Sequence, residues 1–101
     1  MGDWHQAEEH AERAELLLAR GRGAEAEAEI RRAIEIDPVR GEWHAALAMV
    51  LESVGRLEEA LASMRQATVL LPEDVRPLAS SAELSLRLDR AEEALQHAER
   101  A

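Results

Sequence analysis

The sequence contains no cysteine, lysine, phenylalanine or tyrosine, and only two tryptophans. The absence of cysteine excludes disulfides, thiol catalysis and cysteine-ligated zinc. The β-branched and aromatic runs that are typical of strands are missing, so a sheet protein is disfavoured. What the chain does have is 20 alanines in 101 residues. Alanine has the highest helix propensity and lets helices approach closely, which predicts an all-α fold with a thin aliphatic core.

Positive charge is also scarce, because 21 acidic residues outweigh 12 arginines and give a net charge of −9. No basic stripe offsets this charge, so nucleic acid is not expected as a ligand. The longest apolar runs, such as 16–19, are far below the ~20 residues that span a bilayer, and we expect no membrane insertion. The first residues lack the pattern of a secretory signal. We therefore expect a cytoplasmic location for this segment.

A period of 34 residues organises the chain. Shifting the sequence by 34 aligns Arg22 with Arg56 and Arg90, and it also aligns four columns made entirely of alanine. These columns are Ala11, Ala45 and Ala79; Ala14, Ala48 and Ala82; Ala26, Ala60 and Ala94; and Ala33, Ala67 and Ala101. The period predicts a single domain over 1–101 with repeats 7–40, 41–74 and 75–101, the last incomplete, and with 1–6 extending the first helix.

Each repeat is divided into two helices by its turn residues. Gly21 and Gly55 fall in register where a helix ends on a residue that tolerates positive φ. Pro38 and Pro72 end the second helix of their repeats, since proline disfavours helical geometry in the residue before it. In the third repeat Asp89 takes the place of the glycine, and aspartate is an acceptable turn residue. The pattern therefore predicts six helices.

The spacing of large and small residues resembles the tetratricopeptide repeat. The middle unit carries the resemblance with Leu47, Ala48, Leu51, Ala60, Met64, Ala67 and Pro72. The resemblance covers essentially the whole chain and implies a right-handed α-solenoid of three antiparallel helix pairs. It also implies a protein–protein interaction module, or scaffold, with a concave groove lined by the first helix of each pair. The composition is similar to that of proteins from GC-rich bacterial genomes.

The resemblance also implies which residues line the groove. They are Glu8, Ala11, Glu15, Leu18 and Ala19 from the first unit, Glu42, Ala45, Met49, Glu52 and Ser53 from the second, and Arg76, Ala79, Glu83, Leu86 and Arg87 from the third. We expect the three alanines to form a small-residue floor. Five carboxylates and two arginines leave the set at −3, which favours a basic or mixed-charge peptide bound more weakly at high salt. Relatives that clamp acidic chaperone tails use Lys, Arg and Asn, whereas this chain has Glu15 where the Asn is expected.

Neither a catalytic residue, a cofactor nor a metal ion is expected. The two histidines in repeat register, His10 and His44, would lie on helices ~8–10 Å apart, which is awkward for shared coordination. The Gly-rich segment 21–23 lacks the preceding strand and the lysine of a phosphate loop, so we interpret it as a turn. We expect Trp43 to pack between repeats and Trp4 to cover the open end of the first.

A second class of function remains open alongside the interaction module. No further repeat follows to cover Ala91, Ala94, Leu95 and Ala98, although solenoids usually end in a polar capping helix. We expect either that the chain is part of a longer array or that this end pairs with another copy. The alternative function is therefore a structural or oligomerisation segment of a larger multi-repeat protein, or a regulatory segment of an enzyme.

Overall fold

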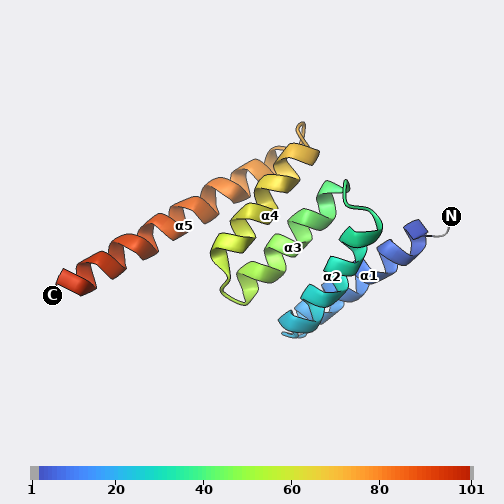
Figure 1. Cartoon of the computed structure of the whole chain (residues 1–101), viewed down its shortest axis with the longest axis horizontal. Coiled ribbons are helices and arrows are strands. Elements are labelled where there is room, and N and C mark those ends of the chain that lie inside the picture. Colours follow the sequence, from blue (N-terminus) through green and yellow to red (C-terminus); the bar gives the residue numbers. More distant parts are fainter. Residues whose placement is uncertain (1–2, 101) are drawn as a thin grey trace.

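The structure is a computed structural model that describes residues 3–100, and within this range it contains five helices and no strand (Figure 1). The helices are α1 (Asp3–Ala19), α2 (Gly23–Ile36), α3 (Gly41–Ser53), α4 (Leu57–Leu70) and α5 (Val75–Arg100). The expected all-α fold is confirmed. The molecule is elongated and flat, with extents of 58 × 31 × 18 Å.

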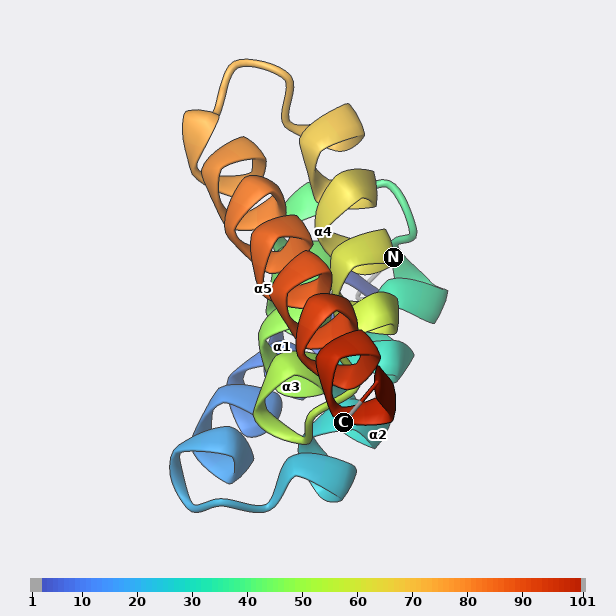
Figure 2. The same ribbon diagram turned by 90° about the vertical axis from the view of Figure 1, so that its left-hand side faces the viewer.

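Helices that are neighbours in the chain lie side by side (Figure 1). The tightest packing is within two hairpins, α1 with α2 and α3 with α4, while α2 packs on α3 and α4 packs on α5. Seen from the side, α5 crosses in front of the other helices (Figure 2), and the view of Figure 1 shows that its C-terminal part projects beyond them. The first two predicted helix pairs are therefore present.

Glycine ends the first helix of each hairpin, as predicted. Gly21 and Gly55 have φ values of 76° and 82°, a conformation that side chains with a Cβ rarely adopt. The amide of Arg22 donates to the carbonyl of Leu17 at 2.8 Å, and the amide of Arg56 donates in the same way to Leu51 at 2.9 Å. These bonds satisfy carbonyls that the end of a helix leaves without partners.

Alanines from the columns found in the sequence form part of the core. Ala26 and Ala60 are fully buried, as are Ala33 and Ala67 in the next column. The largest fully buried side chains are only Ile30, Val50 and Leu51. Helices that cross at alanine can approach closely, so small residues hold the two hairpins together, and Trp43 is the single aromatic residue of the core among the described residues.

The two tryptophans behave differently from one another. Trp43 is buried against the core, and the guanidinium of Arg40 lies 4.7 Å from the centre of its ring. Its packing role is confirmed. Trp4 is 70% exposed, so the expectation that it covers the open end of the first repeat is wrong. It lies at the start of α1, before Ala7, which is the first buried residue that follows it on that helix.

The prediction of a third helix pair is wrong for the described residues. Helix α5 continues through Asp89 to Arg100, where a turn and a sixth helix were predicted. Continuing the helix keeps the backbone of Asp89 hydrogen-bonded, whereas aspartate adopts the left-handed conformation of Gly21 and Gly55 less readily than glycine does. Since no helix folds back, Ala82 is exposed although its register partners Ala14 and Ala48 are buried. Residues 91–99 are exposed as well.

None of the helices in residues 3–100 combines the length and the apolar character needed to cross a membrane.

Candidate functional site

Two hollows adjoin α3 and share one residue, Met49. The larger, of about 470 Å³, lies among α3, α4 and α5. The smaller, of about 330 Å³, lies between α1 and α3. The side chain of Met49 is 56% exposed between them. An exposed methionine flanked by two apolar openings is a surface that can adapt to the side chains of a ligand.

The sequence of α3 explains how this surface forms. Glu42, Ala45, Met49 and Glu52 follow the spacing i, i+3, i+7, i+10, which places them on one face of a helix. All four line the larger hollow. The opposite side of α3 carries Trp43, Leu47 and Leu51, which are buried. Burial of that side fixes the rotation of α3 and so turns its mixed acidic and apolar face outward.

Nine of the predicted groove residues line the hollows, and a tenth forms an ion pair with one of these nine. Those that line the larger hollow are Glu42, Ala45, Met49, Glu52, Arg76 and Glu83, and those that line the smaller are Glu15, Leu18, Ala19 and again Met49. Arg87 lines neither, but it forms an ion pair with Glu52.

The remaining predicted residues lie elsewhere. Glu8 pairs with Arg40 at 3.6 Å. Ala11 is half-buried against the core, and the hydroxyl of Ser53 donates to the carbonyl of Val50 at 2.6 Å. Ala79 and Leu86 are exposed outside both hollows.

The expected floor of three alanines is wrong. Only Ala45 lines a hollow, since Ala11 packs into the core and Ala79 is exposed. The reason lies in α5, which packs on α4 and whose buried residues are Pro77, Ser81 and Leu84. Ala79 is two residues after Pro77 on the helix, so it points away from that contact.

Several lining residues were missed by sequence reasoning. The larger hollow is also bounded by Met64, Leu71, Asp74, Pro77, Ser80 and Leu84, and the smaller by Ala14, Ala46 and Val50. Of these, Asp74 could have been recognised from the sequence, because an aspartate just before a helix is a typical N-cap. Asp74 precedes α5 and accepts a hydrogen bond from the amide of Arg76 at 3.0 Å.

The two arginines of the predicted groove are both paired with acids. Arg76 forms side-chain hydrogen bonds with Asp74, the shortest at 2.7 Å, and Arg87 pairs with Glu52. Hydrogen bonds from the side chain and amide of Arg76 lower the pKa of Asp74 from 3.8 to about 2, and Asp74 in turn raises the pKa of Arg76. Within the described part of the chain, Glu15, Glu42 and Glu83 form no ion pair. Three carboxylates without an ion pair of their own therefore face the openings, and the charge of Glu42 also acts on Arg76 at the border of the larger hollow.

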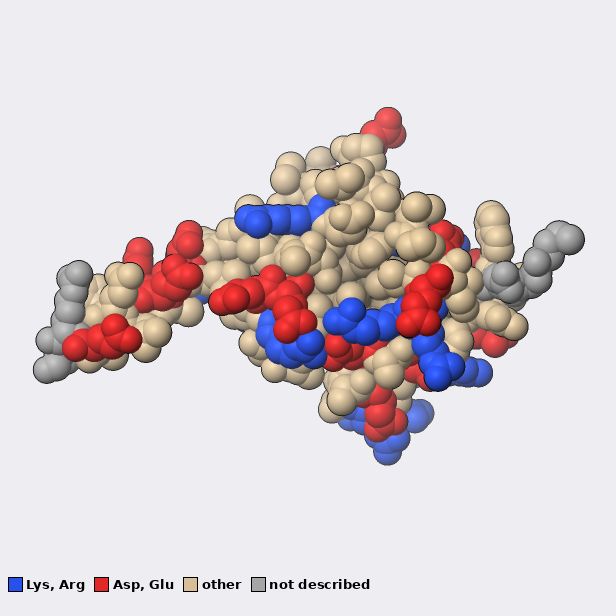
Figure 3. Space-filling view, in the orientation of Figure 1, with Lys and Arg blue, Asp and Glu red and all other residues tan. Residues whose placement is uncertain are grey.

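The acidic character is not confined to the hollows. On the face seen in Figure 3, acidic and basic side chains alternate over the centre of the molecule, whereas acidic ones predominate along the C-terminal part of α5. This distribution reflects the sequence of residues 89–99, where Asp89, Glu92, Glu93 and Glu99 outnumber Arg90. The overall field therefore attracts cations and repels polyanions.

The histidines take local partners. Nδ1 of His10 lies 2.5 Å from a carboxylate oxygen of Glu29 on α2, and Nε2 of His44 lies 2.8 Å from the carbonyl of Pro38. His97 is exposed on α5. Among the described residues no group of three or more histidine, aspartate or glutamate side chains is placed to hold a metal ion.

Comparison with known proteins identifies the family. Residues 5–77 match BTAD, the bacterial transcriptional activator domain. This match covers well over half of the sequence and includes α1 to α4 and the start of α5. The chain belongs to the bacterial transcriptional activator domain family, a family of transcriptional regulators rather than of enzymes. A comparison with curated proteins found no match.

Proposed function

We propose that this segment is a non-enzymatic protein–protein interaction module, which holds a peptide or helix of a partner protein along α1, α3 and α5. The observation that carries the proposal is the pair of hollows that meet at Met49, together with the unpaired carboxylates of Glu15, Glu42 and Glu83 around them. Recognition of an amphipathic segment requires this combination of apolar openings and a charged border.

The partner is a basic or mixed-charge segment. Its apolar side chains enter the hollows on either side of Met49, and its arginine or lysine side chains face Glu42 and Glu83. Complementary charges of this kind accelerate association and fix orientation more than they add affinity. The contacts are exposed to solvent, so binding weakens as salt is raised.

The architecture is that of a tetratricopeptide-type stack, in which two complete helix pairs and α5 form a curved surface. Within a transcriptional activator of the cytoplasm this segment contacts protein rather than DNA, because a net charge of −9 opposes the phosphate backbone.

The test uses a labelled amphipathic helix of about 16 residues, with leucine along one face and arginine along the other, called the Leu/Arg probe. Glu15, Glu42 and Glu52 are changed together to lysine, and the matched control changes the exposed Glu12, Glu58 and Glu92 to lysine. Both variants carry the same net charge. We expect the groove variant to lose probe binding, measured by fluorescence anisotropy, and the control to keep most of it. Equal loss in both variants would show that only the overall charge matters.

A structural or oligomerisation role is the alternative function. It is favoured by the uncovered apolar residues of the α5 tail, where Leu95 is 61% exposed. Sedimentation at several concentrations distinguishes the two functions. Association that is abolished by Leu95→Glu but unaffected by the groove variant supports the alternative, whereas a monomer at all concentrations rejects it.

A further inference from the structure

One carboxylate of the larger hollow, that of Glu52, already forms an ion pair with an arginine of the same chain. Nη1 of Arg87, on α5, donates a hydrogen bond to Oε2 of Glu52, on α3. Glu52 lines the larger hollow, whereas Arg87 does not. The guanidinium thus reaches from outside the hollow to an acid that would otherwise face a ligand.

The neighbouring acids indicate that Glu52 would be available to a ligand cation if Arg87 did not contact it. Glu42 and Glu83 line the same hollow and form no ion pair among the described residues. All three are carboxylates on the border of one apolar opening. The difference at Glu52 is the presence of Arg87.

We propose that Arg87 acts as an internal competitor, occupying at Glu52 the position that a cationic side chain of the ligand would take. The proposal rests on the proposed function and adds a determinant of specificity to it. A ligand cation gains a new ion pair at Glu42 or Glu83, but at Glu52 it only replaces one that exists. The chain therefore discriminates by where the ligand carries its charges.

The exchange at Glu52 is feasible because the existing pair is open to water. The side chains of Arg87 and Glu52 are 40% and 38% exposed. An ion pair at this exposure contributes little to stability, so replacing one guanidinium by another is close to neutral. The position of α5 depends instead on the buried residues Pro77 and Leu84, which remain when Arg87 is changed.

The experiment measures the affinity of the Leu/Arg probe for Arg87→Gln and for the matched control Arg90→Gln. Both substitutions remove one positive charge from α5, but Arg90 is exposed and forms no ion pair with another described residue. We expect Arg87→Gln to bind the probe about 2–5-fold more tightly than Arg90→Gln, the ratio that one exposed ion pair can supply. Equal affinities for the two variants would overturn the proposal.

A second measurement tests the same proposal through Glu52. In the wild-type chain Glu52→Gln should change the affinity for the probe by less than about 2-fold, because that carboxylate is not available. In the Arg87→Gln background the same substitution should remove the gained affinity. Additive effects of the two substitutions would contradict competition at Glu52.

The outcomes separate this inference from the proposed function. Probe binding that is lost in the groove variant, but is equally strong in Arg87→Gln and Arg90→Gln, retains the groove and rejects the role of Arg87. Failure of the probe to bind any variant rejects both. Thermal melts of all variants accompany the titrations, and a melting temperature for Arg87→Gln well below that of Arg90→Gln would assign Arg87 a structural role and overturn the proposal.

Discussion

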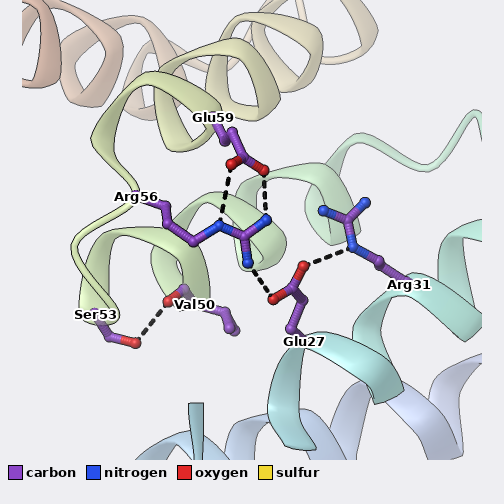
Figure 4. A network of polar contacts seen from close by, with 6 residues as sticks. All are labelled: Glu27, Arg31, Val50, Ser53, Arg56 and Glu59. Carbon is purple, nitrogen blue, oxygen red and sulfur yellow. Dashed lines mark hydrogen bonds and ion pairs between the residues drawn. The ribbon is translucent and has the colours of Figure 1, made fainter. Parts of the chain in front are cut away.

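Arg56 at the start of α4 and Glu27 on α2 join the two helical hairpins across their boundary, with Nη1 and Oε1 2.6 Å apart (Figure 4). Arg56 also binds both carboxylate oxygens of Glu59, and Glu27 accepts a second hydrogen bond from Arg31 at 2.9 Å. One residue of the repeating arginine column thus connects two units. The same link is absent from the third unit, because the register places Leu61 where Arg90 would need an acid.

Substitution of Arg56 by glutamine should weaken the junction in a pH-dependent manner. Hydrogen bonds from Arg31 and Arg56 lower the pKa of Glu27 below its ordinary 4.5, and Arg56 lowers that of Glu59. A lowered carboxyl pKa adds stability that is fully present above the unfolded value and is lost as the pH falls through the folded value.

We therefore expect Arg56→Gln to melt at a lower temperature than wild type at pH 7. The difference should shrink below the ordinary pKa of 4.5 and also at high salt. The exposed Arg32→Gln serves as the control of equal charge. A difference that persists unchanged at low pH would contradict the ion-pair explanation.

Substitution of Ala60 by leucine should destabilise the fold, whereas Ala94→Leu should not. The two residues are in repeat register, but Ala60 is fully buried and Ala94 is exposed on α5. Overpacking a helix crossing costs about 1–3 kcal/mol. Chemical denaturation of both variants provides the measurement. If Ala94→Leu proves as destabilising as Ala60→Leu, the tail of α5 is packed against another helix in solution.

Substitution of Ser81 by alanine should leave stability unchanged or raise it. Ser81 is 8% exposed on α5, and its hydroxyl has no hydrogen-bond partner among residues 3–100. Burial of an unsatisfied hydroxyl costs about 1–3 kcal/mol, which the substitution relieves in part. The less buried Ser80→Ala is the control. A clear loss of stability in urea denaturation for Ser81→Ala alone would show that the hydroxyl has a partner.

Substitution of Asp74 by asparagine should remove part of the acid sensitivity of the fold. The pKa of Asp74 is lowered from 3.8 to about 2, so its contribution is present above pH 3.8 and is lost as the pH falls towards 2. We expect Asp74→Asn to be less stable than wild type at neutral pH and to change less over that acidic range. The exposed Asp89→Asn should follow the wild-type profile in thermal melts.

The features of the fold that the sequence predicted correctly are those that depend on local backbone and side-chain chemistry. Gly21 and Gly55 mark helix ends because of their backbone freedom, and the burial of Ala26 and Ala60 follows from the repeat register of the two hairpins. The course of α5 could not be predicted in the same way. At Asp89 an uninterrupted helix competes with a turn followed by hairpin packing, and that balance depends on distant surfaces.

The residues of the candidate site could likewise be predicted only where local helical spacing determines their position. The outward face of α3, from Glu42 to Glu52, follows from helical spacing and from burial of the other side. The contributions of Leu71 and Asp74 depend on how α5 sits on α4, which no local pattern specifies. The pairing of Arg87 with Glu52 depends on the same placement, so the charges available to a ligand were apparent only from the structure.

The groove itself is tested most directly by a titration of the ¹⁵N-labelled chain with the Leu/Arg probe, followed residue by residue by NMR. The account predicts that the largest chemical-shift changes occur at Leu18, Ala45, Met49 and Leu84, which line the two hollows. Changes confined to residues 91–99, or to Arg56 and Glu59, which line neither hollow, would contradict it.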